Sequence, residues 1–191
     1  MHTSIYMVRH GESPTKEGDY NERTRGLTEK GKRDALQVTD ILRKEDIEVF
    51  VSSPYLRAIL TIEDLARASG QEVILYEDLK ERIFLNEDKR LPDEELIPLL
   101  ELSFVDPDFA LPGGESNADC QGRAIAVVKE LLNYYNGRKI ALGTHGAVMT
   151  LIMNHYDKIY DLDFLLNMSK PDVYRLDFDG EELVNVIRLW K

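Results

Sequence analysis

Short apolar runs alternate along this chain with longer segments that are apolar on one helical face. The short runs are apolar throughout and of strand length, which is typical of parallel strands buried on both faces. They lie at 5–8, 49–51, 73–76 and 140–142. The longer segments predict helices, because their apolar residues recur every three to four positions. They lie at 28–44, 54–69, 94–104, 116–135 and 146–154. Strictly alternating strands and helices indicate an α/β fold.

The end of the chain departs from this alternation. Segments 173–178 and 183–189 flank Asp179-Gly180, a dipeptide typical of a two-residue hairpin turn. We therefore expect a three-layer αβα sandwich: a mainly parallel sheet with helices on both faces and a C-terminal β-hairpin. Because no repeat, low-complexity segment or linker divides the sequence, we expect one domain over residues 1–191.

Charge and composition exclude several classes of partner. The chain has 24 basic and 35 acidic side chains and a net charge of −11, which argues against nucleic acid or an anionic membrane as the main partner. Cys120 is the single cysteine and cannot form an internal disulfide, which favours a reducing compartment. The N-terminus lacks a signal-peptide pattern, and no stretch approaches the about 18 apolar residues of a membrane span. We expect a cytoplasmic protein, whose oligomeric state the sequence does not determine.

Polar residues follow three of the predicted strands at the point where each strand ends. Arg9 and His10 come at the end of the first strand, Arg57 lies one turn into the helix after the second, and His145 follows the fourth. Two of the four histidines thus stand in matching places, each followed by glycine. Because ligands of open α/β sheets bind beyond the carboxyl ends of the strands, we expect these four side chains to share one pocket.

Two imidazoles beside two guanidinium groups suit phosphate better than metal. Neighbouring cations repel a metal ion, and no carboxylates complete a ligand set, so we expect neither a metal nor another cofactor. Guanidinium groups bind phosphate oxygens in pairs, and a neutral imidazole is a nucleophile near pH 7. In so acidic a protein, a local cationic pocket has to reverse the field that an anionic substrate meets.

Five segments, in order along the chain, resemble the motifs of the histidine phosphatase superfamily, also called the phosphoglycerate mutase-like family. They are 9–13 (RHGES), 27–31 (LTEKG), 52–58 (SSPYLRA), 112–116 (PGGES) and 144–146 (THG). The first resembles the RHG signature and the last resembles the motif of the second histidine. The RHG triplet alone would be weak evidence for the family. Five motifs in the family's order over residues 9–146 make a specific match.

The resemblance implies a role for each matching residue. His10 is the nucleophile that becomes phosphohistidine, and Arg9, Arg57 and His145 complete the phosphate pocket. Glu81, in the segment 79–82 (LKER), is the general acid and base that protonates the leaving oxygen and then activates water. Acidic neighbours at 77, 78, 87 and 88 leave open a solvated acidic face as the alternative for this glutamate.

Departures from the family's pattern favour a phosphatase over a mutase. Lys16 stands where mutase-type members carry asparagine, and the Arg-Arg pair with which they grip a carboxylate is missing between Glu81 and Pro112, where the cations are Arg82, Lys89 and Arg90. Four cations are candidate contacts to the rest of the substrate: Lys16, Arg23, Arg25 and Arg82. We predict a metal-independent phosphomonoesterase acting on a small phosphorylated metabolite or a phosphoprotein. The alternatives are a cofactor-dependent phosphoglycerate mutase and a catalytically silent phosphate-binding module.

Overall fold

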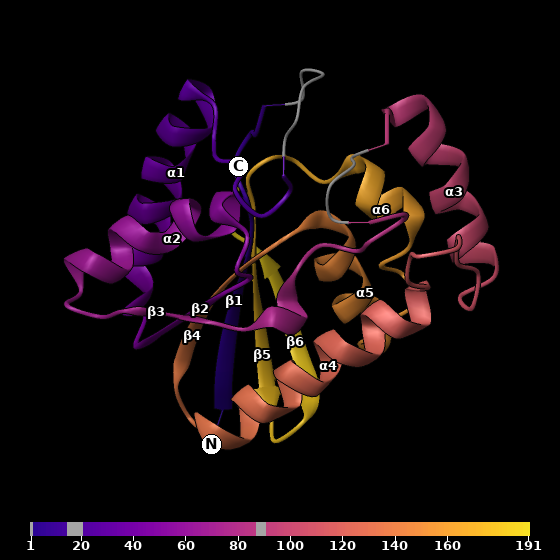
Figure 1. Cartoon of the computed structure of the whole chain (residues 1–191). Helices are drawn as coiled ribbons and strands as arrows, with labels where there is room; N and C mark the ends of the chain where they lie inside the picture. Colours follow the sequence, from indigo (N-terminus) through magenta and orange to yellow (C-terminus); the bar gives the residue numbers. More distant parts are fainter. Residues whose placement is uncertain (1, 15–20, 87–90) are drawn as a thin grey trace.

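The computed structural model describes residues 2–14, 21–86 and 91–191, and in this part of the chain six strands form one mixed sheet in the order β3-β2-β4-β1-β5-β6 (Figure 1). The pairs β1–β4, β2–β4 and β2–β3 are parallel, whereas β1–β5 and β5–β6 are antiparallel. The strands are β1 (His2–Arg9), β2 (Val49–Ser52), β3 (Val73–Leu75), β4 (Lys139–Thr144), β5 (Asp172–Asp179) and β6 (Glu182–Arg188).

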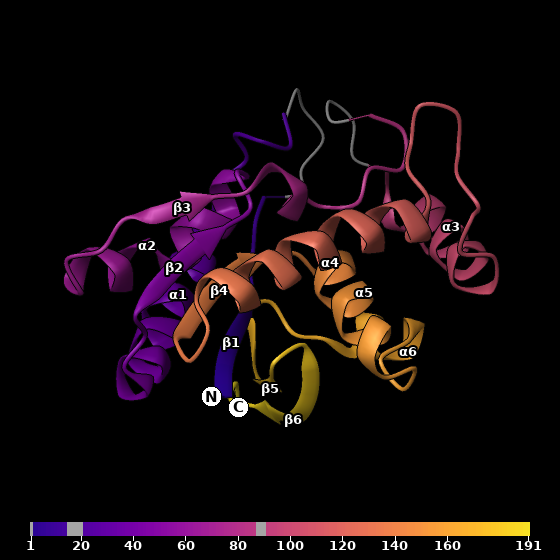
Figure 2. The ribbon, with the colours of Figure 1, turned by 90° about the horizontal axis from the view of Figure 1, so that it is seen from below.

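Helices cover both faces of the sheet, which confirms the predicted fold class. Successive side chains of a strand point to opposite faces, so β1 divides its core residues between two layers. Tyr6 and Val8 pack with residues of α1 and α2, and Ile5 and Met7 pack with residues of α4 and α5. Figure 2 shows these two helix pairs on opposite sides of the strands. The helices are α1 (Glu29–Leu42), α2 (Leu56–Ala68), α3 (Asp93–Val105), α4 (Asn117–Tyr134), α5 (Gly146–Tyr156) and α6 (Leu162–Asn167).

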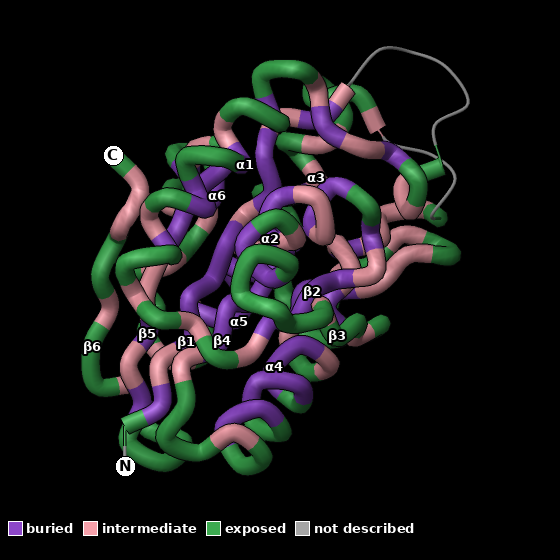
Figure 3. Tube along the Cα trace, turned by 90° about the vertical axis from the view of Figure 1, so that its left-hand side faces the viewer, coloured by how far each residue is buried: buried purple, intermediate pink, exposed green. Residues whose placement is uncertain are grey.

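Burial follows the position of each strand in the sheet. Most residues of β1 and β4 are buried, whereas β6 is exposed along most of its length, as Figure 3 shows. This pattern explains why the central strands are continuous apolar runs in the sequence and the edge strand is not. No helix in the described segments is both long and apolar enough to cross a membrane.

Two local features differ from the sequence-based prediction. The hairpin turn consists of Gly180 and Glu181, one residue later than expected, because Asp179 still pairs with Glu182. Gly180 has a φ of 60°, which favours glycine at the first turn position. The six-residue helix α6 was not predicted, and it begins where the Asp161 side chain accepts a hydrogen bond from the backbone of Phe164.

Candidate active site

The two motif histidines lie side by side because their strands are neighbours. β1 and β4 run parallel with Arg9 opposite Thr144, so both strands end at the same edge of the sheet. The His10 backbone nitrogen donates to the Thr144 carbonyl at 3.0 Å, and His145 is the N-cap of α5. As a result the ring centroids of His10 and His145 are 5.2 Å apart, with planes inclined by 64°.

Close backbone packing explains the glycines of the first two motifs. A Cβ atom on Gly11 would lie 2.9 Å from the Gly31 carbonyl oxygen, and one on Gly31 would lie 2.2 Å from the Glu12 carbonyl oxygen. The loop after β1 therefore rests directly on the first turn of α1. Thr28 strengthens this contact, because its backbone nitrogen donates to the Glu12 carbonyl at 2.9 Å and its hydroxyl caps the helix at Gly31.

His10 presents an unprotonated nitrogen to its surroundings. Its Nδ1 lies 2.7 Å from the Gly11 carbonyl oxygen, which can only accept, so Nδ1 carries the proton. Nε2 accepts a hydrogen bond of 3.2 Å from Arg57 Nε. Burial, together with the charges of Arg57 and Arg9, holds the pKa of His10 well below its ordinary value. The imidazole is therefore neutral in the near-neutral range, with its lone pair on Nε2.

Arg57 is held by a carboxylate as well as by His10. The residue is 1% exposed, its Nη1 donates to the Glu22 backbone carbonyl at 2.7 Å, and its Nη2 lies 2.8 Å from a Glu22 carboxylate oxygen. Arg25 binds the same carboxylate through two nitrogens and donates to the Ser13 hydroxyl at 2.9 Å. Burial and the neighbouring Arg25 lower the pKa of Arg57 to about 10, so its guanidinium is still charged at neutral pH.

Arg9 extends from the end of β1 along the opposite side of the same pocket. Its Nη1 donates to the Met168 carbonyl at 2.6 Å and to the Ser169 carbonyl at 3.3 Å. The guanidinium lies against Gly146, where a Cβ atom would be 2.9 Å from it. Its buried Nε has no hydrogen-bond partner among the described residues. A buried charged donor without a partner is costly, so an anion in the pocket would be stabilising.

His145 lies beneath the pocket rather than in its wall. It has no exposed surface, and its Nε2 is 2.8 Å from the Ser53 hydroxyl. Its Nδ1 has no partner in the described part of the chain. Burial, together with Arg57 and His10, holds the pKa of His145 well below its ordinary value, so this ring too is neutral.

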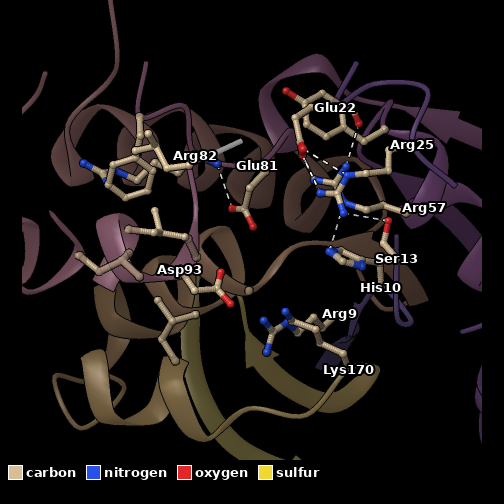
Figure 4. A pocket seen from close by; sticks show the side chains of 18 of the residues that line it. Arg9, His10, Ser13, Glu22, Arg25, Arg57, Glu81, Arg82, Asp93 and Lys170 are labelled. Carbon is tan, nitrogen blue, oxygen red and sulfur yellow. Dashed lines mark hydrogen bonds and ion pairs between the residues drawn. The ribbon is translucent and has the colours of Figure 1, made fainter. Parts of the chain in front are cut away.

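Glu81 reaches the pocket from the loop that follows β3. Figure 4 shows its carboxylate directed into the space that His10 and Arg9 also face. Its Oε1 accepts from the Arg82 backbone nitrogen at 2.9 Å, which orients the carboxylate. Arg123 of α4 holds the loop itself by donating to the carbonyls of Asp78, Lys80 and Glu81 at 2.6, 2.9 and 3.3 Å. The Glu81 carboxylate is therefore carried on a fixed backbone.

The four predicted contacts to the rest of the substrate have different surroundings. Arg25 lies in the pocket beside Arg57, as described above. Arg23 is half-exposed and pairs with Glu77, which lowers the pKa of that carboxyl to about 2. The Arg82 guanidinium packs on the Phe84 ring at 3.9 Å from its centroid and donates to the Ser103 hydroxyl. Lys16 lies outside the described residues, as do Lys89 and Arg90.

These groups surround a cavity of about 890 Å³ with two unlike sides. One side carries Arg9, His10, Arg25, Arg57 and Lys170, and the other is lined mainly by apolar side chains of α3 and α6 (Figure 4). Within the described segments, no group of three or more His, Cys, Asp or Glu side chains is arranged to hold a metal ion. The charged side can bind a tetrahedral anion next to a nucleophilic nitrogen.

Sequence comparison identifies the family from which this arrangement comes. The family model described as the histidine phosphatase superfamily (branch 1) matches residues 5–190, nearly the whole chain. The chain belongs to the histidine phosphatase superfamily. A curated relative, the probable phosphoglycerate mutase of Salmonella choleraesuis, is 29% identical over 159 residues, which cover 78% of this chain and 73% of the relative.

Solved structures of histidine phosphatase folds superpose closely on this one. A mycobacterial glucosyl-3-phosphoglycerate phosphatase aligns with a TM-score of 0.78 at 20% identity and covers 100% of this chain and 99% of its own. A phosphoserine phosphatase variant of Entamoeba histolytica, bound to phosphoserine, has a TM-score of 0.78 at 22% identity, covering 98% and 96%. YhfR of Bacillus stearothermophilus has a TM-score of 0.78 at 25% identity, covering 95% and 94%. These neighbours establish the fold.

The polar residues around the site that were missed in the sequence include Glu22, Arg123 and Lys170. Lys170 precedes β5, which runs antiparallel to β1 with Asp172 opposite Arg9. The start of an antiparallel strand lies at the same edge as the end of its neighbour, and this rule would have pointed to Lys170. No comparable signal marks Glu22 or Arg123, because Arg57, which Glu22 binds, and the loop carbonyls that Arg123 holds are distant from them in the sequence.

Proposed function

We propose that this member of the superfamily is a metal-independent phosphomonoesterase that forms a phosphohistidine on His10, with Glu81 as general acid and base. The observation that carries the proposal is a neutral, buried imidazole whose Nε2 lone pair lies between two guanidinium groups in a cavity that a carboxylate also enters. The guanidinium groups of Arg9 and Arg57 supply the charge that a phosphoryl group in transfer requires. His145 contributes a further contact to the phosphoryl oxygens.

The reaction divides into two displacements at phosphorus. In the first, the His10 Nε2 lone pair forms the N–P bond as the ester P–O bond breaks, and the leaving oxygen takes a proton from Glu81. In the second, the Glu81 carboxylate takes a proton from water as the water oxygen bonds to phosphorus. The P–N bond breaks as this P–O bond forms, so that inorganic phosphate leaves and the lone pair returns to Nε2.

A phosphoglycerate mutase is the second candidate, because the curated relative carries that name. We expect the purified protein, in chelator-treated buffer, to release inorganic phosphate from a panel of phosphomonoesters. We expect less than about one isomerisation per hundred hydrolytic turnovers with 3-phosphoglycerate, even with 2,3-bisphosphoglycerate as primer. Phosphate release and isomer formation are both measured by ³¹P NMR. Predominant isomerisation would establish the mutase, and tight phosphate binding without any turnover would establish the silent module.

Replacing Glu81 with glutamine tests the acid role. We expect kcat/KM for an alkyl phosphate, whose leaving oxygen needs a proton, to fall by at least about a hundredfold. For p-nitrophenyl phosphate we expect less than about a tenfold fall, because p-nitrophenolate leaves without protonation. The ratio kcat/KM is the proper measure, since it reports the first displacement alone. Glu77→Gln, four residues earlier on the same loop, is the matched control, and equal losses on both substrates would assign the acid elsewhere.

A further inference from the structure

The cavity extends beyond the phosphate-binding side into a region lined by one face of α3. Asp93, Leu96, Ile97 and Leu100 all line the cavity, and their spacing of three and four residues places them on a single face of the helix. Leu100 is buried, whereas Ile97 is 40% exposed although it lies in the cavity wall. This helix face thus offers apolar surface to whatever enters the cavity.

Helices α5 and α6 complete this apolar wall. Ala147, Leu165 and Leu166 line the cavity together with Phe84, and Leu166 is 49% exposed. Leu100, Ala147 and Leu165 form a small core cluster against which Phe84 packs, so the wall is fixed from behind. Exposed leucine and isoleucine inside a preformed cavity are typical of a ligand site, because binding removes their apolar surface from water.

The charge of this region is opposite to that of the phosphate-binding side. Neither α3 nor α6 contains a lysine or arginine, and α3 begins with three consecutive acids, Asp93, Glu94 and Glu95. Figure 4 shows the Asp93 carboxylate directed into the cavity. Arg82 also lines the cavity, but its guanidinium is buried against the Phe84 ring and donates to the Ser103 hydroxyl and the Glu115 carbonyl. A carboxylate or second phosphate on the leaving group would therefore face mainly aliphatic side chains and the Asp93 carboxylate, and burying an unpaired charge there is costly.

We infer that the apolar wall formed by Phe84, Leu96, Ile97, Leu100, Leu165 and Leu166 is the leaving-group site, and that it takes an uncharged, apolar group. The substrate class is thus a small monophosphate ester of an aliphatic or aromatic alcohol without a second acid. This inference rests on the proposed function for the phosphate end of the substrate, and it adds the identity of the alcohol end.

A series of n-alkyl phosphates isolates binding from chemistry, because ethyl, butyl and hexyl phosphate have leaving groups of nearly equal basicity. We expect kcat/KM to rise with chain length by up to about fourfold for each methylene that becomes buried. The phosphate ester of 6-hydroxyhexanoate has the six carbons of hexyl phosphate but ends in a carboxylate in place of the methyl group. We expect its kcat/KM to be at least about tenfold lower than that of hexyl phosphate.

Two variants test whether the dependence of kcat/KM on chain length comes from the apolar wall. In the double variant Ile97→Ser and Leu166→Ser we expect the slope of log kcat/KM against chain length to fall by at least half. Both side chains are substantially exposed, so the fold tolerates the change. The matched control is Leu102→Ser, which changes a leucine on α3 that is 50% exposed and outside the cavity lining. We expect the control to keep the full slope.

The outcomes separate this inference from the proposed function. Hydrolysis of p-nitrophenyl phosphate with a flat alkyl series, or with a preference for the carboxylate ester, would overturn the apolar site and leave the phosphatase intact. If no ester is hydrolysed, the proposed function fails, and titration calorimetry with the corresponding alkylphosphonates tests the wall by itself. A Kd that does not fall with chain length would then overturn the inference.

Discussion

Changing His10 to alanine is expected to lower kcat for p-nitrophenyl phosphate by at least about four orders of magnitude, the scale of loss when a covalent nucleophile is removed. In the proposed mechanism Nε2 is the atom that forms the N–P bond, and alanine offers no replacement. The neighbouring His145 is fully buried and already engaged with the Ser53 hydroxyl, so it cannot take over from its present position.

Rapid quenching measures the intermediate as well as the rate. We expect wild-type protein mixed with labelled substrate to hold an acid-labile, base-stable phosphoryl group, as a phosphohistidine does, and the His10→Ala protein to hold none. His155→Ala is the control, because His155 is exposed near the end of α5 and away from the cavity lining. A His10→Ala protein that keeps one hundredth or more of the wild-type kcat would exclude His10 as the nucleophile.

Removing the Arg57 guanidinium is expected to lower kcat/KM by about a thousandfold, the lower end of the range for an arginine that stabilises a transferring phosphoryl group. Arg57 is 1% exposed and contacts His10 Nε2 directly, so we expect both phosphate binding and the chemical step to depend on it. We therefore expect KM to rise and kcat to fall together. Arg57→Lys restores the charge without the planar fork, and we expect it to recover only part of the loss.

The matched control is Arg67→Ala, on the same helix but exposed and paired with two acids of its own helix. Because Arg57 also holds the Glu22 carboxylate, thermal unfolding must first show that Arg57→Ala is folded. Inorganic phosphate is expected to raise the Tm of the wild-type protein and of Arg67→Ala, but not of Arg57→Ala. Unchanged stabilisation by phosphate in Arg57→Ala would contradict its place in the phosphate pocket.

The elements of the fold were largely predictable, because each depends on local patterning. The buried strand around Ile5 and Met7 is apolar throughout since helices cover both of its faces, and Ser116 caps α4 with its own side chain as expected. The short helix α6 escaped prediction because six residues provide less than two full turns of periodicity. The hairpin turn shifted by one residue because strand pairing, and not the Asp-Gly dipeptide alone, decides where a turn lies.

The site, like the fold, has a part that could be predicted from the sequence and a part that could not. Local patterning was enough to predict which side chains follow the central strands. Four of them could be named from their order along the chain, and they lie together at one sheet edge: Arg9, His10, Arg57 and His145. The tertiary structure alone decided the surroundings of these groups. The pairing of Glu22 with Arg57 and the apolar wall across the cavity join segments far apart in the chain. The order of strands and helices along the chain can be predicted because it depends on local hydrophobic patterns. A cavity cannot, because it is the space left between elements after they have packed.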